Sequence, residues 1–147
     1  MAGQLNIHSF INHVITVNGR TLEGFGEGDD VVTVEYREDG ITDTVGADGR
    51  MQASVSANES ATINLKLLAG SEDNDYLEDL YFKFKNGSIG GISVSIFDSF
   101  TGRGQVATTG YIPKLANESK GAKAQDREWS IIVPKIDIQR ATNRRSN

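Results

Sequence analysis

Apolar and polar residues alternate one by one along many short stretches of this chain, and this alternation limits the fold more than any other feature. The clearest stretch is 61–68, in which Ala61, Ile63, Leu65 and Leu67 alternate with Thr62, Asn64 and Lys66. A period of two places the apolar side chains on one face of an extended strand. Weaker patterns of the same kind predict further strands at residues 11–17, 21–23, 31–37, 41–45, 51–55, 92–97, 105–112, 129–133 and 135–139.

One segment follows a helical period instead. Ser71 is a typical helix cap, and three acids within residues 72–75 suit a first turn, where the helix dipole favours negative charge. The apolar residues that then recur at helical spacing are Tyr76, Leu77, Leu80, Tyr81 and Phe84. Asn86 and Gly87 form a typical helix stop. The pattern predicts a single helix between Ser71 and Asn86.

Glycine and proline mark the breaks between these elements. The chain has 147 residues with 16 glycines and two prolines, which suits strands joined by tight turns. Asn18-Gly19 is a strong hairpin turn signal, and Pro134 predicts a bend or an edge between the last two strands. We therefore expect a mainly β fold, either a β-sandwich or a small barrel, with one flanking α-helix.

The charge is unevenly distributed along the chain. The formal net charge is −5, but three of the 15 basic residues lie in the last eight positions. We expect residues 1–139 to form one domain with an exposed hairpin arm at about 38–55, and residues 140–147 to be a basic, flexible C-terminal tail. An acidic body does not grip nucleic acid through its phosphates, although it suits a passage through which DNA slides without sticking. Solubility alone is the simpler explanation of the same acidity.

Several classes of site and of location are excluded or disfavoured. The chain has no cysteine, which excludes disulfides, thiol catalysis and thiolate zinc sites and favours a reducing cytoplasm as the place of assembly. The N-terminus has no basic segment followed by an apolar run, and no apolar stretch reaches the ~20 residues of a membrane helix. We therefore expect neither a signal peptide nor a stable membrane association.

The residues that could carry chemistry do not form a recognisable site. His8 and His13 are five apart and would point to opposite faces of a strand, which disfavours a shared metal. The glycines in 24–28 precede two acids and a strand, whereas a phosphate-binding loop precedes a helix. The acids of 73–75 lack the spacing of a calcium loop and fit a helix start better. We therefore predict no catalytic residue, no metal site and no cofactor, and we expect that the chain is not an enzyme.

The polar faces and edges of the strands suggest assembly. Several strands have one apolar face and one face of small polar and charged residues, and such a second face can line water. Long strand edges must be covered or paired, and pairing them with neighbouring subunits in a closed ring removes the edge. The arm at 38–55 and the polar segment 113–127, which we expect to be a long exposed loop, are candidates to reach such neighbours. A single β-sandwich with ordinary loops fits the same pattern equally well.

A family resemblance favours assembly. The chain resembles the tail-tube proteins of contractile-tailed phages from about Ser9 to Gln139. The segments that carry the resemblance are Ser9-Phe10-Ile11, Gly24-Phe25-Gly26-Glu27-Gly28, Thr44-Val45-Gly46-Ala47-Asp48-Gly49, residues 61–68 and Glu128-Trp129-Ser130-Ile131-Ile132-Val133-Pro134-Lys135-Ile136-Asp137. The Gly-Ala-Asp-Gly turn and the ending from Trp129 are the most specific of these.

The resemblance implies a structural virion protein. Its subunits would form hexameric rings that stack into the inner tube of a contractile tail, a conduit for DNA ejection, after assembly in the cytoplasm of the host bacterium. The implied partners are further copies of the chain, the tail sheath protein, the initiator or baseplate and terminator proteins, and DNA that passes through the lumen without specific binding. The residues expected to face the lumen are Thr33, Glu35, Thr62, Asn64 and Lys66. Those expected to contact the neighbouring ring through the arm are Ile41, Thr44, Val45, Asp48 and Met51.

Three alternatives remain open from the sequence. The first is the tube protein of a related contractile injection or secretion system, and the second is another tail part, such as a tube-capping or initiator protein. The third, from a different class, is a monomeric ligand-binding β-sandwich or small enzyme. Ring formation would favour the tube and tail proteins, whereas a monomer with a concave apolar pocket would favour the third.

Overall fold

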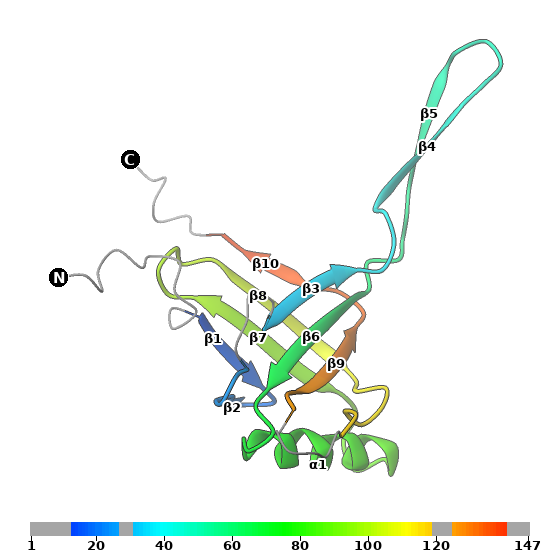
Figure 1. The fold of residues 1–147 in the computed structure, drawn as a ribbon. Coiled ribbons are helices and arrows are strands. Elements are labelled where there is room, and N and C mark those ends of the chain that lie inside the picture. The colour runs from blue at the N-terminus through cyan, green and yellow to red at the C-terminus, as the bar shows by residue number, and fades with distance from the viewer. Residues whose placement is uncertain (1–12, 27–30, 119–124, 141–147) are drawn as a thin grey trace.

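A computed structural model of the chain describes residues 13–26, 31–118 and 125–140, and it is mainly β with one helix (Figure 1). The elements, in chain order, are β1 (His13–Val17), β2 (Arg20–Thr21), β3 (Val32–Tyr36), β4 (Ile41–Val45), β5 (Met51–Val55), β6 (Ala61–Leu67), α1 (Asp73–Lys85), β7 (Ile92–Asp98), β8 (Gly104–Gly110), β9 (Arg127–Val133) and β10 (Asp137–Gln139). The fold class expected from the sequence is confirmed. His8, Ile11, residues 27–30 and 119–124, and the tail from 141 lie outside the described residues, so the predictions that fall on them stay predictions.

The strands form two packed sheets and a separate hairpin. One sheet has the order β10-β8-β7-β1-β2, the second has the order β3-β6-β9, and β4 pairs only with β5 among the described residues. All of these pairs are antiparallel. An isolated bridge between Tyr111 and Ile132 joins the end of β8 to β9, so the two sheets are linked at one side like the wall of a small barrel.

The core lies between the two sheets, and β6 is its central strand. Burial alternates residue by residue along β6, and its predicted apolar face, formed by Ala61, Ile63, Leu65 and Leu67, is at most 2% exposed. The other sheet contributes Ile15, Val17, Ile92, Val94 and Ile96. Each fully buried aliphatic side chain contributes about 1.5–3 kcal/mol relative to an exposed one, so this interdigitated layer is the main source of stability.

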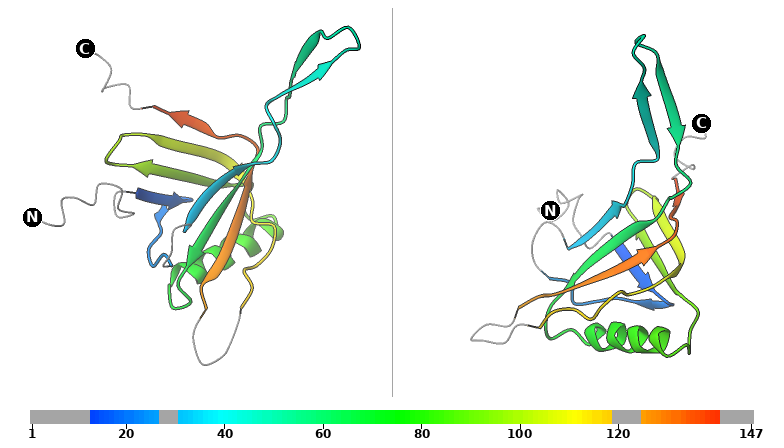
Figure 2. Two further views of the ribbon diagram at one scale, coloured as in Figure 1. Left: turned by 45° about the horizontal axis from the view of Figure 1, so that its top comes forward. Right: turned by 90° about the vertical axis from the view of Figure 1, so that its right-hand side faces the viewer.

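Helix α1 covers one end of the sandwich, at the opposite end from the β4–β5 hairpin (Figures 1 and 2). Of its predicted apolar stripe, Leu77 and Leu80 are buried, and Tyr76 packs against the core while it is partly exposed. The Tyr76 hydroxyl donates to the carbonyl oxygen of Val17 at 3.0 Å, and burial raises the pKa of this phenol. The helix ends as expected, because Asn86 is the C-cap and Gly87 adopts a φ of +83°.

The acids at the helix start serve a different purpose from the one the sequence suggested. Asp73 is 3% exposed, and its carboxylate accepts from the Arg20 guanidinium at 2.7 Å and from the backbone N–H of Glu23 at 2.6 Å. It therefore ties α1 to the β1–β2 hairpin, whereas the sequence had explained it only by the helix dipole. The capping position is taken by Glu72, and the Ser71 hydroxyl, one residue earlier, accepts from the N–H of Asp73 at 3.3 Å.

Asn74 makes a second buried junction beside Asp73. Its amide nitrogen donates to the carbonyl oxygen of Leu68 at 2.8 Å, and its amide oxygen accepts from the indole nitrogen of Trp129 at 3.0 Å. Asn74 is 1% exposed and Trp129 2%. These bonds satisfy the Asn74 amide and the Trp129 indole N–H inside the core, and they join the helix to the end of β6 and to β9.

The turns and connections follow the sequence in most places. Asn18 and Gly19 both have positive φ, 51° and 91°, as the type I′ turn between β1 and β2 requires. Pro134 lies at a bend, after which the chain leaves the sheet of β9 and joins the other sheet as β10. The long exposed loop predicted at 113–127 is wrong in part, because Leu115 and Ala116 pack against the core and Arg127 already belongs to β9.

Removal of the Asn74 amide should destabilise the fold. In Asn74→Ala the buried indole N–H of Trp129 loses its acceptor, and a buried orphaned donor costs about 1–3 kcal/mol. Asp75→Ala is the matched control, because Asp75 lies in the same turn and is exposed. We expect urea unfolding to show the lower midpoint for Asn74→Ala only. Equal midpoints for the two variants would contradict the role given to Asn74.

Candidate functional site

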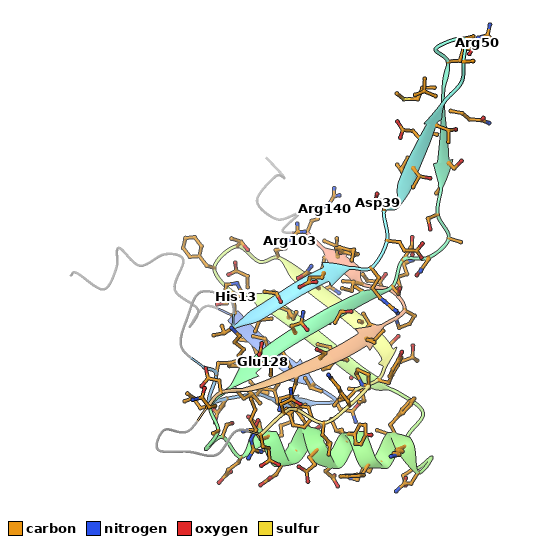
Figure 3. The ribbon with its side chains drawn as sticks, turned by 45° about the vertical axis from the view of Figure 1, so that its right-hand side comes forward. His13, Asp39, Arg50, Arg103, Glu128 and Arg140 are labelled. Atoms are coloured by element: carbon orange, nitrogen blue, oxygen red, sulfur yellow. The ribbon has the colours of Figure 1, made fainter. Side chains whose placement is uncertain are left out.

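The β4–β5 hairpin projects from the body as an arm and is exposed throughout. Every residue of both strands is solvent-exposed. Figure 3 shows Asp39 near the base of the arm and Arg50 at its tip, far from the two sheets. A two-stranded hairpin that packs on nothing else has little stability alone in water, and the arm is therefore a candidate functional element.

The two faces of the arm differ in chemistry. The register pairs Ile41 with Val55, Asp43 with Ala53, and Val45 with Met51, so these six side chains share one face. We call them the apolar arm face. Its large members are 61–83% exposed. The opposite face carries the paired Thr42 and Ser54 and the paired Thr44 and Gln52.

A tight polar turn closes the tip of the arm. The N–H of Gly46 donates to the carbonyl oxygen of Arg50 at 2.8 Å, and Gly49 has a φ of +84°. The Asp48 carboxylate accepts from the N–H of Arg50 at 3.1 Å. These bonds fix the register, and the register decides which side chains share a face.

The structure separates the five arm residues that the sequence singled out. Ile41, Val45 and Met51 lie on the apolar arm face, Thr44 lies on the polar face, and Asp48 lies in the tip turn. Sequence reasoning missed Val55, the most exposed of the large apolar residues on that face, and Asp43, the one charge there. The tip turn was recognisable in the sequence, and counting the register outward from it would have found both residues.

The five residues expected to face a lumen come together on one surface. Cross-strand pairs join Thr33 to Asn64 and Glu35 to Thr62 on the outward face of β3 and β6, and Lys66 continues that face. The Asn64 amide donates to the Glu35 carboxylate at 3.4 Å. Two residues of β9 complete the surface and were missed: Ser130 donates to the Asn64 amide oxygen at 2.7 Å, and Glu128 is paired with Lys66.

A polar groove borders this surface on the β9 side. It has a volume of about 260 Å³ and is lined by Asn64, Lys114, Leu115, Asn117, Asp126, Glu128 and Ser130. Figure 3 shows Glu128 on β9, at the lower end of the three-stranded sheet. Within residues 13–26, 31–118 and 125–140, no cluster of histidine and acidic side chains could hold a metal ion.

The outer edge of β3 offers backbone groups for pairing. Val31 accepts from the N–H of Lys66 at 2.9 Å, and Arg37 donates to the carbonyl oxygen of Ser60 at 3.0 Å. Because the bonded pairs of an antiparallel ladder alternate, the N–H and C=O groups of Val32, Val34 and Tyr36 point away from β6. In the described part of the chain β3 pairs only with β6, and β10 pairs only with β8.

Comparison with known proteins assigns the chain to a family. Residues 5–140 match the family of the bacteriophage PhiTE tail tube protein. The chain belongs to this tail-tube family. It is therefore a structural tail protein of the tube type and not an enzyme. The described helix, α1, does not have the length and hydropathy to cross a membrane.

A curated relative supports the assignment. The structural protein ORF10 of Pseudomonas phage KPP10 is 29% identical to this tail-tube chain over 137 residues, which cover 92% of this chain and 79% of the relative.

Solved structures share the fold at low identity. One chain of the tube-terminating cap of the anti-feeding prophage has a TM-score of 0.60 at 7% identity, with 88% of each chain covered. A chain from the sheath/tube terminator of the extracellular contractile injection system PVC has a TM-score of 0.59 at 10% identity, covering 89% of this chain and 95% of that one. A chain from the PVC sheath–tube complex has a TM-score of 0.58 at 12% identity, with 88% of each chain covered.

The direction of the β3 backbone groups can be tested by proline substitution. Tyr36 and Glu35 are adjacent and both exposed, but only the N–H of Glu35 points toward β6. Glu35→Pro should lower the free energy of unfolding by about 1 kcal/mol or more, because it leaves a carbonyl of the central strand without its donor. Tyr36→Pro should cost less. Thermal unfolding of the two variants compares their stabilities. An equal loss of unfolding free energy in Glu35→Pro and Tyr36→Pro would contradict the assigned register.

Proposed function

We propose that the chain forms hexameric rings that stack into the inner tube of a contractile phage tail, through which DNA leaves the virion. The observation that carries the proposal is the combination, in one tail-tube chain, of a strand edge that no other described strand pairs with and an exposed two-faced arm. An edge allows association around a ring, and an arm allows association along a stack.

Ring closure needs two different, complementary surfaces on each subunit, because the contacts in a ring larger than a dimer are head-to-tail. The edges of β3 and β10 meet this need. They belong to different sheets, and among the described residues β3 pairs only with β6 and β10 only with β8, so each strand has an outer edge. Pairing β3 of one subunit with β10 of the next would add main-chain hydrogen bonds and remove both edges.

The lumen is assigned to the outward face of β3 and β6. Thr33, Thr62 and Asn64 offer small, hydrated polar groups, and the positive charge of Lys66 lies opposite Glu128. A surface without a concentrated positive patch does not hold phosphates, so DNA could pass without sticking.

The arm is assigned to stacking between rings. Burial of the apolar arm face against a neighbouring ring would remove four large side chains from water, Ile41, Val45, Met51 and Val55. Thr44 on the other face and Asp48 at the tip would form the polar rim of that contact.

The proposed partners and location follow from the same assignment. In the finished tail the tube would lie inside the sheath and would contact an initiator or baseplate protein at one end and a terminator at the other. The subunits would assemble in the host cytoplasm. The names of the structural relatives, which include terminator and sheath–tube assemblies, support these partner classes.

A second candidate is the tube protein of a contractile injection system. The fold likeness to chains of such systems favours it. The family match and the phage relative favour the phage tail more strongly, because they rest on the sequence itself.

Replacement of the arm should separate rings from tubes. A variant in which a short Gly-Ser linker replaces residues 41–55 should keep the thermal stability of the body, because the whole hairpin is exposed. Negative-stain electron microscopy should show rings for this variant and hollow tubes for the parent chain. The stacking role is wrong if the variant forms tubes as long and as stable as those of the parent.

The lumen assignment can be tested by labelling an introduced cysteine with thiol reagents of different size. The chain has no cysteine of its own, so only the introduced one reacts. In Thr62→Cys, iodoacetamide should label both free subunits and assembled tubes. A maleimide on a large polyethylene glycol should label free subunits but react much more slowly with tubes. Equal labelling by the large reagent in both states would place Thr62 on the outside and overturn the assignment.

A further inference from the structure

One aromatic side chain of α1 has no role in the fold described above. Leu77 and Leu80 are buried beneath the helix, whereas Phe82 is 46% exposed. At 100° per residue, Phe82 points nearly opposite to Leu80 and Phe84, toward the solvent side. Its ring meets the ring of Tyr81 edge-on, with centroids 5.2 Å apart. Phenylalanine is among the aromatic residues that are enriched at protein interfaces, so this ring suits a contact with another molecule.

The charges around Phe82 divide the solvent side of α1 in two. The first half carries the acids Asp75, Glu78 and Asp79, and the last turn carries Lys83 and Lys85. Lys83 is bound to Asp79 at 2.9 Å, and the Lys85 nitrogen lies 5.6 Å from the centroid of the Tyr81 ring. The two lysines offset the negative end of the helix dipole, so the last turn can accept a carboxylate that the first half would repel.

The apolar arm face has the complementary composition. It presents Ile41, Val45, Met51 and Val55 around a single carboxylate, that of Asp43. A surface that covers this face should therefore offer an apolar side chain with a cation beside it.

The shape of the subunit brings these two surfaces together in a stack. The arm leaves the body at one end and α1 covers the opposite end, as two views at right angles show (Figures 1 and 2). When copies stack in the same orientation along this axis, the arm end of one copy meets the α1 end of the next. Within one copy the two surfaces are too far apart to touch.

We propose that the apolar arm face docks on the last turn of α1 of a second copy, in the adjacent ring. Phe82 enters the apolar face between the two strands, and Lys85 lies beside Asp43. This inference rests on the proposed stacking and adds the receiving surface and its polarity, since the contact joins two different surfaces and can extend without limit along one direction.

Engineered disulfides test the contact in a chain that has no cysteine. Ala53 lies on the apolar arm face opposite Asp43, and Ser54 lies on the other face. Tubes of the double variant Ala53→Cys with Phe82→Cys should form a ladder of covalent oligomers under mild oxidation, seen on a non-reducing gel. The matched control, Ser54→Cys with Phe82→Cys, should remain monomeric on the gel, because the side chain at 54 points to the opposite face of the arm, and a disulfide cannot join side chains that point apart.

The possible outcomes test the docking contact and the formation of the tube separately. Tubes without a ladder from the Ala53 pair, or with an equal ladder from the Ser54 pair, would overturn the docking contact and leave the tube standing. Failure of the parent chain to form tubes, even with its tail initiator present, would overturn both.

A charge swap gives an independent measure of the same contact. Asp43→Lys should shorten the tubes or prevent them from forming, and addition of Lys85→Glu should restore their length, because the pair is then reversed. All the substituted side chains are exposed in the free subunit, so the fold should be unaffected. A double variant no better than Asp43→Lys alone would contradict the pairing.

Discussion

The side chain of Asn74 joins segments that lie far apart along the chain. Through one amide it binds the end of β6 and the indole of Trp129 on β9, while its neighbour Asp73 binds Arg20 and the loop after β2. A buried polar group is costly unless it is fully bonded, so these contacts allow only one placement of α1 over the open end of the sandwich. That placement in turn sets which side chains of the helix face the core and which face outward. The exposure of Phe82 in the last turn is a consequence of the junction at the first turn.

The body and the candidate assembly surfaces are built from different parts of the sequence. The core residues come from strands of both sheets, from α1 and from short segments beside them, and none comes from β4 or β5. The edge of β3 and the arm can therefore change partners or lose them while the core stays intact. In the proposed tube the two kinds of contact also differ in chemistry. The ring would use backbone hydrogen bonds, which depend little on side chains, and the stack would use apolar side chains, which depend on them strongly.

The sequence predicted what is local and missed what depends on distant partners. The alternation along β6, the Asn18-Gly19 turn and the end of α1 each arise within a few residues, and each is confirmed, whereas the helix cap is Glu72 and not the predicted Ser71. Asp73 looked like an ordinary first-turn acid, because its partner Arg20 is 53 residues away. The partial burial of Leu115 was hidden for the same reason, since a polar segment with one leucine reads as an exposed loop. The candidate lumen residues lie together because they share one strand pair, whereas the grouping of the arm residues depends on the cross-strand register that the tip turn sets.

The arm also shows why assembly and order would be linked in such a chain. Its two strands are held by one ladder and one polar turn, and a lone hairpin of this size is only marginally stable in water. Its polar face of Thr42, Thr44, Gln52 and Ser54 can remain hydrated in any state, whereas the apolar face gains free energy only when another surface covers it. A contact that buries this face therefore stabilises both the neighbouring copy's position and the arm's own fold. In the proposed stack each added ring would order the arms of the ring it meets, so the rings would be held more firmly within the tube than at its free end.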